Sequence, residues 1–181
     1  MKPLKLLSLA IDRFSDLWGA VATILILGMV GFGSYNAIVR YLGRFIGLNL
    51  SSNVYLELQW YLFSLIFLLG AGWTLRKDSH VRVDVFYSAL TRRGQRRVNL
   101  IGTFLLLIPF SVFVLWTSLA YVQNSWTTRE MSPDPGGLPR YPLKAIIPLC
   151  FVLLLLQGLS EAIKLFTQRG EQTDGEAEAA E

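Results

Sequence analysis

Apolar residues dominate four stretches of the chain, and each stretch is long enough to cross a bilayer as a helix. The stretches cover residues 17–39, 56–75, 98–121 and 145–166. About 20 mainly apolar residues are needed to span roughly 30 Å of hydrocarbon. The first and third contain no charged residue, whereas Glu57 begins the second and Glu161 lies near the end of the fourth. The pattern predicts an all-α integral membrane protein with four transmembrane helices.

The connections between these stretches differ in composition. Residues 76–97 mix valine, phenylalanine and tyrosine with arginine, which is typical of a short amphipathic element at the membrane interface. Residues 41–55 also hold apolar positions, and near their end lie Ser51, Ser52 and Asn53, one of which should cap the second helix. The connection 131–142 contains four prolines and two glycines and therefore cannot be a continuous helix.

We predict two parts in the chain, a four-helix membrane domain over residues 1–169 and an acidic tail over residues 170–181. The tail combines five acidic residues with Gly, Gln, Thr and Ala, a composition that favours disorder. The apolar run that follows the basic amino terminus is longer than a signal-peptide core, and no small-x-small cleavage pattern follows this run before Arg40. We therefore interpret this run as a retained first helix.

Lysine and arginine are concentrated beside alternate connections. Twelve of the 17 flank the two termini and the connection 76–97, and five flank the other two connections. Because cytoplasmic loops are enriched in these residues, both termini are predicted to be cytoplasmic. The net charge of +4 follows mostly from this bias, so we expect contacts with anionic membrane lipids and no nucleic-acid partner. The larger group comprises Lys2, Lys5, Arg13, Arg76, Lys77, Arg82, Arg92, Arg93, Arg96, Arg97, Lys164 and Arg169.

The residues that usually carry enzymatic chemistry are scarce in this sequence. The chain has one histidine, His80, and one cysteine, Cys150, which lies in the fourth apolar stretch and is expected to be a packing residue. This content provides neither a two-histidine haem site nor a metal cluster, and no P-loop motif is present. The sequence therefore predicts a protein that is not an enzyme, with no catalytic residue, cofactor or metal.

Glu57 is the acidic residue closest to a membrane-embedded position. At the start of a helix it could stabilise the positive helix terminus, or it could contact a partner helix or an ion. Trp60 lies three residues later, so the two side chains are expected to share a helix face that a partner could contact. Small residues at Gly28, Gly31 and Ser34, and at Gly70 and Gly72, could let helices approach closely.

Several short motifs occur in a characteristic order along these four stretches. The first set is Glu57-x-x-Trp60, Leu69-Gly70-Ala71-Gly72 and His80-Val81-Arg82-Val83-Asp84. The second set is Trp126, Glu130, Ser132, Gly136-Gly137-Leu138-Pro139, Pro142-Leu143-Lys144 and Leu156-Gln157-Gly158. In this order the chain resembles the DctQ-like small permease subunit of tripartite ATP-independent periplasmic (TRAP) transporters over roughly residues 17–164.

This resemblance implies a role within a complex in the bacterial inner membrane. In that family a periplasmic solute-binding protein delivers an organic acid, typically a carboxylate, to a large membrane subunit that imports it with a sodium gradient. The small subunit packs beside the large one as a scaffold. The resemblance marks eight residues as candidates for subunit contacts or structural roles: Glu57, Trp60, Gly70, His80, Arg82, Asp84, Glu130 and Ser132.

Two other functions remain open from the residues alone. One is a small four-helix exporter that couples transport to a proton or cation at Glu57. The long basic connection, the proline-rich connection and the position of Glu57 near an interface argue against it. The other is an accessory membrane subunit of a respiratory complex. The residues that would select a substrate are not recognisable in this chain.

Overall fold

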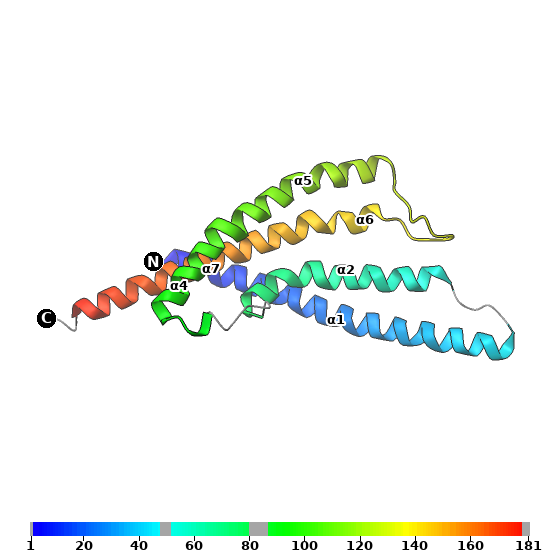
Figure 1. The fold of residues 1–181 in the computed structure, drawn as a ribbon, viewed down its shortest axis with the longest axis horizontal. Helices are drawn as coiled ribbons and strands as arrows, with labels where there is room; N and C mark the ends of the chain where they lie inside the picture. Colours follow the sequence, from blue (N-terminus) through cyan, green and yellow to red (C-terminus); the bar gives the residue numbers. More distant parts are fainter. Residues whose placement is uncertain (1, 48–51, 80–86, 179–181) are drawn as a thin grey trace.

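A computed structural model describes residues 2–47, 52–79 and 87–178, which form long helices lying roughly along one direction (Figure 1). In chain order the elements are α1 (Lys2–Ile46), α2 (Asn53–Arg76), α4 (Arg92–Ile101), the π-helical stretch η1 (Gly102–Leu107), α5 (Ile108–Thr127), α6 (Tyr141–Lys144) and α7 (Ile146–Glu178). Within the described residues no β-strand is present.

Four helical segments of the described chain are long and apolar enough to span a membrane, which confirms the predicted fold class. They cover residues 3–46, 53–76, 93–127 and 141–167, and each is longer than the sequence pattern predicts. α1 alone has 45 residues. At about 1.5 Å per residue it measures roughly 68 Å, about twice the hydrocarbon thickness. This helix therefore extends well beyond the hydrocarbon or is strongly tilted.

The helices define two ends of the bundle. At the terminal end, α1 begins, α2 ends and α4 begins, whereas the loop end holds the end of α1, the start of α2 and the loop 128–140 (Figure 1). α7 is the central helix, because it packs against α1, α2 and α5. The four spanning segments alternate in direction, as the four-span topology requires.

Glycines permit the closest helix contacts. A Cβ atom on Gly19 would lie 2.5 Å from the Trp73 ring, and one on Gly72 would lie 3.3 Å from the carbonyl oxygen of Leu153. Gly70 is buried, with Ala22 on α1 as its neighbour. The predicted stripe on α1 behaves differently, because a Cβ on Gly28 or Gly31 would meet no atom within 4 Å.

The third spanning segment contains a local irregularity immediately before a proline. In η1, which precedes Pro109, the amide of Ile108 donates to the carbonyl oxygen of Thr103, five residues earlier. Proline has no amide hydrogen, and in an α-helix its ring collides with the carbonyl four residues back. A wider π-helical turn avoids this collision, so the helix is locally π-helical immediately before Pro109.

Two further expectations concern helix ends. Ser52 caps α2, because its hydroxyl accepts a hydrogen bond from the amide of Val54 at 3.3 Å. The structure continues α7 to Glu178, so residues 170–178 are helical where the sequence predicts a disordered tail. Elongating an existing helix is far easier than nucleating one, and Glu, Gln and Ala favour it. The division of the chain at residue 169 stays a prediction.

Candidate functional site

The loop 128–140 folds back onto α2 through the carboxylate of Glu57. One carboxylate oxygen accepts a hydrogen bond from the hydroxyl of Ser132, and the other accepts from the amide of Leu138 at 2.5 Å. Glu57 is 8% exposed. We call this group, Glu57 with Ser132 and Leu138, the loop cluster. Its geometry shows that Glu57 serves as an anchor for the loop within the chain.

Additional contacts fix the same loop in position. The hydroxyl of Tyr61 donates to the carbonyl of Pro139, and the side-chain Nδ2 of Asn53 donates to the carbonyl of Pro135 at 3.3 Å. A single antiparallel bridge joins Met131 to Pro139. Three residues of α2, spaced by four positions, therefore hold one loop along a single side of the helix.

Gly137 leaves the space in which this anchor forms. A Cβ atom at this position would lie 2.5 Å from the Cβ of Ser132 and 2.7 Å from Oε1 of Glu57. Gly136, beside it, has a φ of 72°, a conformation that favours glycine. The Gly-Gly pair therefore combines a tight turn with a close approach of the loop backbone to the carboxylate.

Glu130 lies at the start of the loop and joins it to the end of α5 and to α6. Its carboxylate accepts hydrogen bonds from Lys144 and from Ser125, the latter at 2.8 Å. The ammonium of Lys144 also lies 4.1 Å from the centre of the Tyr121 ring. The hydrogen bond from Lys144, followed by that from Ser125, holds the pKa of Glu130 below its usual range.

The lowered pKa of Glu130 predicts a pH-dependent contribution to stability. A carboxyl whose pKa is lower in the folded than in the unfolded state stabilises the fold above its unfolded pKa, and this contribution is lost as the pH falls through its folded pKa. We expect Glu130→Gln to lower the melting temperature at neutral pH, and the difference from the unsubstituted protein to disappear in acid. Thermal unfolding of both proteins in detergent over a pH series measures this. A difference independent of pH would contradict it.

Trp60 does not share the environment of Glu57, contrary to the expectation from their spacing. Trp60 is 71% exposed, whereas Glu57 is buried beneath the loop. Residues three positions apart on a helix are offset by about 60°, and the loop covers only one side of α2. The exposed aromatic side chains on α2 are Trp60, Phe63 and Phe67. This surface is available to lipid or to a partner chain.

A second polar cluster lies at the terminal end, between α1 and α7. The Oδ1 atom of Asp12 accepts hydrogen bonds from Ser160 at 2.8 Å, Lys164 at 3.0 Å and Gln157 at 3.2 Å. Gln157 and Ser160 are completely buried, and Asp12 is 7% exposed. We call this group, Asp12 with Gln157, Ser160 and Lys164, the terminal cluster.

Neighbouring side chains extend the terminal cluster to α2 and along α1. Nη1 of Arg76 donates to the backbone carbonyl of Asp12 at 2.8 Å, and its guanidinium forms an ion pair with Asp16. The hydroxyl of Ser15 donates to Oε1 of Gln157 at 2.6 Å. Lys164 also pairs with Glu161 at 2.7 Å. Three helices therefore meet through polar contacts at this end.

The sequence interpretation did not identify the terminal cluster. The sequence pattern that could have revealed it is a set of polar residues, repeated at helical spacing, within two otherwise apolar helices. On α1 these are Ser8, Asp12 and Ser15, and on α7 they are Gln157, Ser160, Glu161 and Lys164. Spacings of three, four and seven place each set on one helix face. Polar faces that match in this way predict a contact between the two helices.

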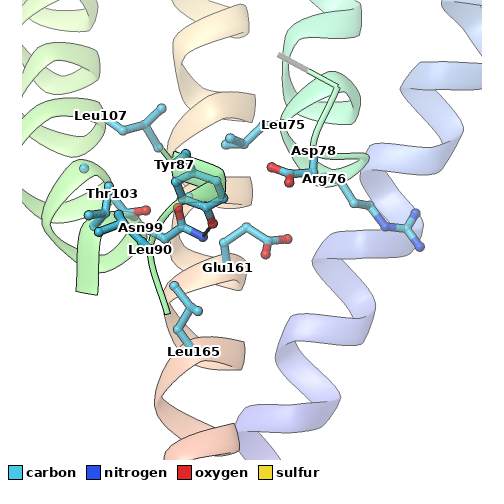
Figure 2. A pocket seen from close by; sticks show the side chains of 13 residues that line it. Leu75, Arg76, Asp78, Tyr87, Leu90, Asn99, Thr103, Leu107, Glu161 and Leu165 are labelled. Atoms are coloured by element: carbon cyan, nitrogen blue, oxygen red, sulfur yellow. Dashed lines mark hydrogen bonds between the residues drawn. The ribbon is translucent and has the colours of Figure 1, made fainter. Parts of the chain in front are cut away.

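A cavity of about 790 Å³ lies at the terminal end between α2, α4, η1 and α7. Figure 2 shows Leu75, Leu107 and Leu165 on its walls, with the Glu161 carboxylate between them and the Arg76 side chain directed towards α1. Tyr87 and Asn99 hydrogen bond at 2.9 Å. Within the described residues no group of three His, Cys, Asp or Glu side chains could hold a metal. The cavity has a mostly apolar wall with a few polar groups.

The other sequence-predicted residues have separate positions. Gly70 is a helix contact on α2, remote along that helix from Glu57. His80, Arg82 and Asp84 lie outside the residues that the structure describes. Ser132 and Glu130 lie in the loop 128–140, which Glu57 of α2 anchors. The structure thus brings together three of the eight candidates.

Comparison with known proteins identifies the chain. The family model for the DctQ component of tripartite ATP-independent periplasmic transporters matches residues 29–168. A relative from Halomonas elongata, the ectoine TRAP transporter small permease protein TeaB, is 29% identical over 151 residues, which cover 82% of this chain and 75% of the relative. No solved structure matches the chain. The chain therefore belongs to the DctQ family, the small permease components of TRAP transporters, which are transport subunits and not enzymes.

Proposed function

We propose that this chain braces the large membrane subunit of a TRAP transporter in the bacterial inner membrane. In this proposal a periplasmic solute-binding protein delivers an organic acid to the large subunit, which imports it with a sodium gradient. The observation that carries the proposal is the match of the DctQ family model to residues 29–168. Family membership favours this function over a self-contained exporter or a respiratory subunit.

The contacts within the chain support a bracing role. α2 is anchored at the loop end by Glu57 and Tyr61, and at the terminal end by Arg76. Polar contacts at both ends resist sliding of α2 along its neighbours, because sliding would break hydrogen bonds in a weakly solvated environment. A helix held in this way offers a fixed surface to a partner that moves during transport.

The proposed orientation places the terminal end in the cytoplasm and the loop 128–140 in the periplasm. It rests on the excess of lysine and arginine at the termini and in residues 76–97. An impermeant thiol reagent applied from the periplasm should label a cysteine at Pro133 and spare one at Ala89, in a Cys150→Ser background. The reverse labelling pattern would overturn the orientation.

We expect Trp60→Ala to weaken association with the large subunit while leaving the fold of this chain intact. Trp60 is 71% exposed, so its removal creates no cavity within the chain. A tryptophan at the centre of an interface typically contributes about 2 kcal/mol or more to binding, a loss of roughly thirtyfold in affinity. Co-purification with the tagged large subunit measures the effect.

Trp116→Ala provides a matched control for this experiment. Trp116 is 74% exposed, and it lies on α5 rather than α2. If α2 provides the contact, only the Trp60 variant should reduce co-purification. Equal losses in the two variants, or no loss in either, would contradict an interface on the exposed aromatic side of α2.

Reconstitution tests the function directly. Proteoliposomes that contain this chain and the large subunit should take up the organic acid when the solute-binding protein and a sodium gradient are supplied. Omission of this chain should reduce or abolish uptake, and this chain alone should transport nothing. Saturable uptake by the purified chain alone would overturn the proposal in favour of a self-contained carrier.

A further inference from the structure

A polar pocket of about 360 Å³ lies between α1 and α2 at the loop end. Its polar lining consists of Asn36, Arg40 and Arg44 from α1 with Gln59 from α2, and Tyr41 lies beside them. The three α1 residues are spaced by four positions and lie on one side of that helix. Gly33 gives Gln59 room, because a Cβ atom there would be 2.6 Å from Nε2 of Gln59.

Asn36 is the buried residue of this pocket. It is 6% exposed, and its Oδ1 atom has no hydrogen-bond partner among the residues that the structure describes. A buried acceptor without a partner is unfavourable, and such groups are rare in folded proteins. Asn36 lines the pocket together with the two arginines. A ligand that carries a hydrogen-bond donor would satisfy this oxygen.

Arg40 and Arg44 add two positive charges to the same pocket. Neither forms an ion pair with a described residue, and no acidic side chain is among the described residues that line the pocket. Guanidinium groups bind phosphate oxygens through paired, charge-assisted hydrogen bonds. The pocket therefore combines donors for an anion with an acceptor for a neighbouring donor group.

The position of the pocket indicates the source of the anion. The uncharged stretch 17–39 ends immediately before Arg40, so the two guanidinium groups lie where hydrocarbon meets headgroups. Tyr41 lines the pocket, and its ring centre lies 5.0 Å from that of Phe45, which is 73% exposed. These side chains offer a surface for acyl chains next to a polar headgroup site.

We propose that this pocket binds the headgroup of phosphatidylglycerol. Arg40 and Arg44 bind the phosphodiester, and a hydroxyl of the glycerol headgroup donates to Oδ1 of Asn36. The volume is within the range of small-ligand sites. Phosphatidylcholine lacks such a donor and carries no net negative charge, so it fits less well. The bound lipid would hold α1 and α2 together where the chain leaves the membrane.

Native mass spectrometry of the purified full chain tests this proposal. The unsubstituted protein should retain phosphatidylglycerol in preference to phosphatidylcholine, and millimolar inorganic phosphate should not displace the lipid. In Arg40→Gln/Arg44→Gln the retention should fall about tenfold, since charge-assisted hydrogen bonds contribute on that order. Asn36→Leu should produce a smaller loss. Circular dichroism confirms that each variant is folded.

Arg129→Gln is the matched control, because Arg129 is an exposed arginine at the same end of the bundle and outside the pocket. It should leave the lipid preference unchanged. Three results would overturn the proposal: equal retention of the two lipids, full retention in the double variant, or an equal loss in Arg129→Gln. Displacement by inorganic phosphate would instead identify a site for free anions. Retention of lipid only when the large subunit is present would assign the pocket to the subunit interface.

Discussion

Replacing Asp12 with leucine is expected to destabilise the helix bundle by about 3 kcal/mol, the lower end of the range for removing one partner of a buried ion pair. Asp12 is 7% exposed and accepts hydrogen bonds from Ser160, Gln157 and Lys164. Without it, the ammonium of Lys164 keeps only Glu161 as an anionic partner in the described structure. The Lys164 side chain is 31% exposed, so water offsets part of the loss. Denaturant unfolding in detergent micelles measures the change.

Asp16→Asn is the matched control for Asp12→Leu. Asp16 lies one helical turn away and also pairs with Arg76, but its side chain is 44% exposed. Exposed ion pairs contribute about 1 kcal/mol or less, so this change should be mild. A combined Asp12→Leu and Lys164→Met variant should recover part of the stability, because the Lys164 ammonium is no longer present without Asp12, whereas Glu161 loses its ion pair with Lys164. Equal small losses for Asp12→Leu and Asp16→Asn would show that the terminal cluster does not hold α1 to α7.

Replacing Glu57 with leucine is expected to release the loop 128–140 from α2. The substitution removes the acceptor for both the hydroxyl of Ser132 and the amide of Leu138. A buried donor that loses its acceptor costs about 1–3 kcal/mol. Because the Ser132 hydroxyl and the Leu138 amide are partly exposed, we expect the docking of the loop to weaken by about 2 kcal/mol in total. Trypsin should then cleave after Arg140 about thirtyfold faster, since cleavage follows the population of the open loop. Hydrogen exchange at the Leu138 amide provides a second measurement.

Two further variants separate the contribution of the Glu57 carboxylate to loop docking from that of the other loop contacts. Asn53→Ala removes only an exposed hydrogen bond of 3.3 Å to Pro135, so it should change the cleavage rate little. In Glu57→Gln the side-chain amide can still accept a hydrogen bond from Leu138 and donate one to Ser132. Its cleavage rate should therefore lie between those of Glu57→Leu and Asn53→Ala. Cleavage of the Glu57→Leu protein at the unsubstituted rate would mean that Tyr61 and the loop itself provide the anchor. In the proposed transporter, loss of uptake in Glu57→Gln with the loop still docked would indicate a direct role of the charge in coupling.

For Glu57, residue spacing predicts its neighbours on the same helix but not its contacts with distant segments of the chain. The sequence placed Glu57 at the start of a helix and grouped it with Trp60, because residues three apart are neighbours on a helix. It also placed Ser132 and Gly137 in a non-helical connection, and the family resemblance marked Glu130 as a candidate. It did not predict that the loop would fold back onto Glu57, more than 70 residues earlier in the chain. That contact depends on the relative positions of α2 and α5, which no local pattern specifies.

The sequence alone determined the number of spanning helices, a non-helical connection within residues 131–142, a helix cap among residues 51–53 and the resemblance to the DctQ family. These properties depend on local composition, because a helix in lipid must satisfy its backbone hydrogen bonds within its own segment. The tertiary structure decided which polar residues meet. It joined Asp12 to Lys164, covered Glu57 with a loop and left Trp60 exposed. Such pairings depend on the rotation and offset of each helix against its neighbours, which are set by the packing of the whole bundle.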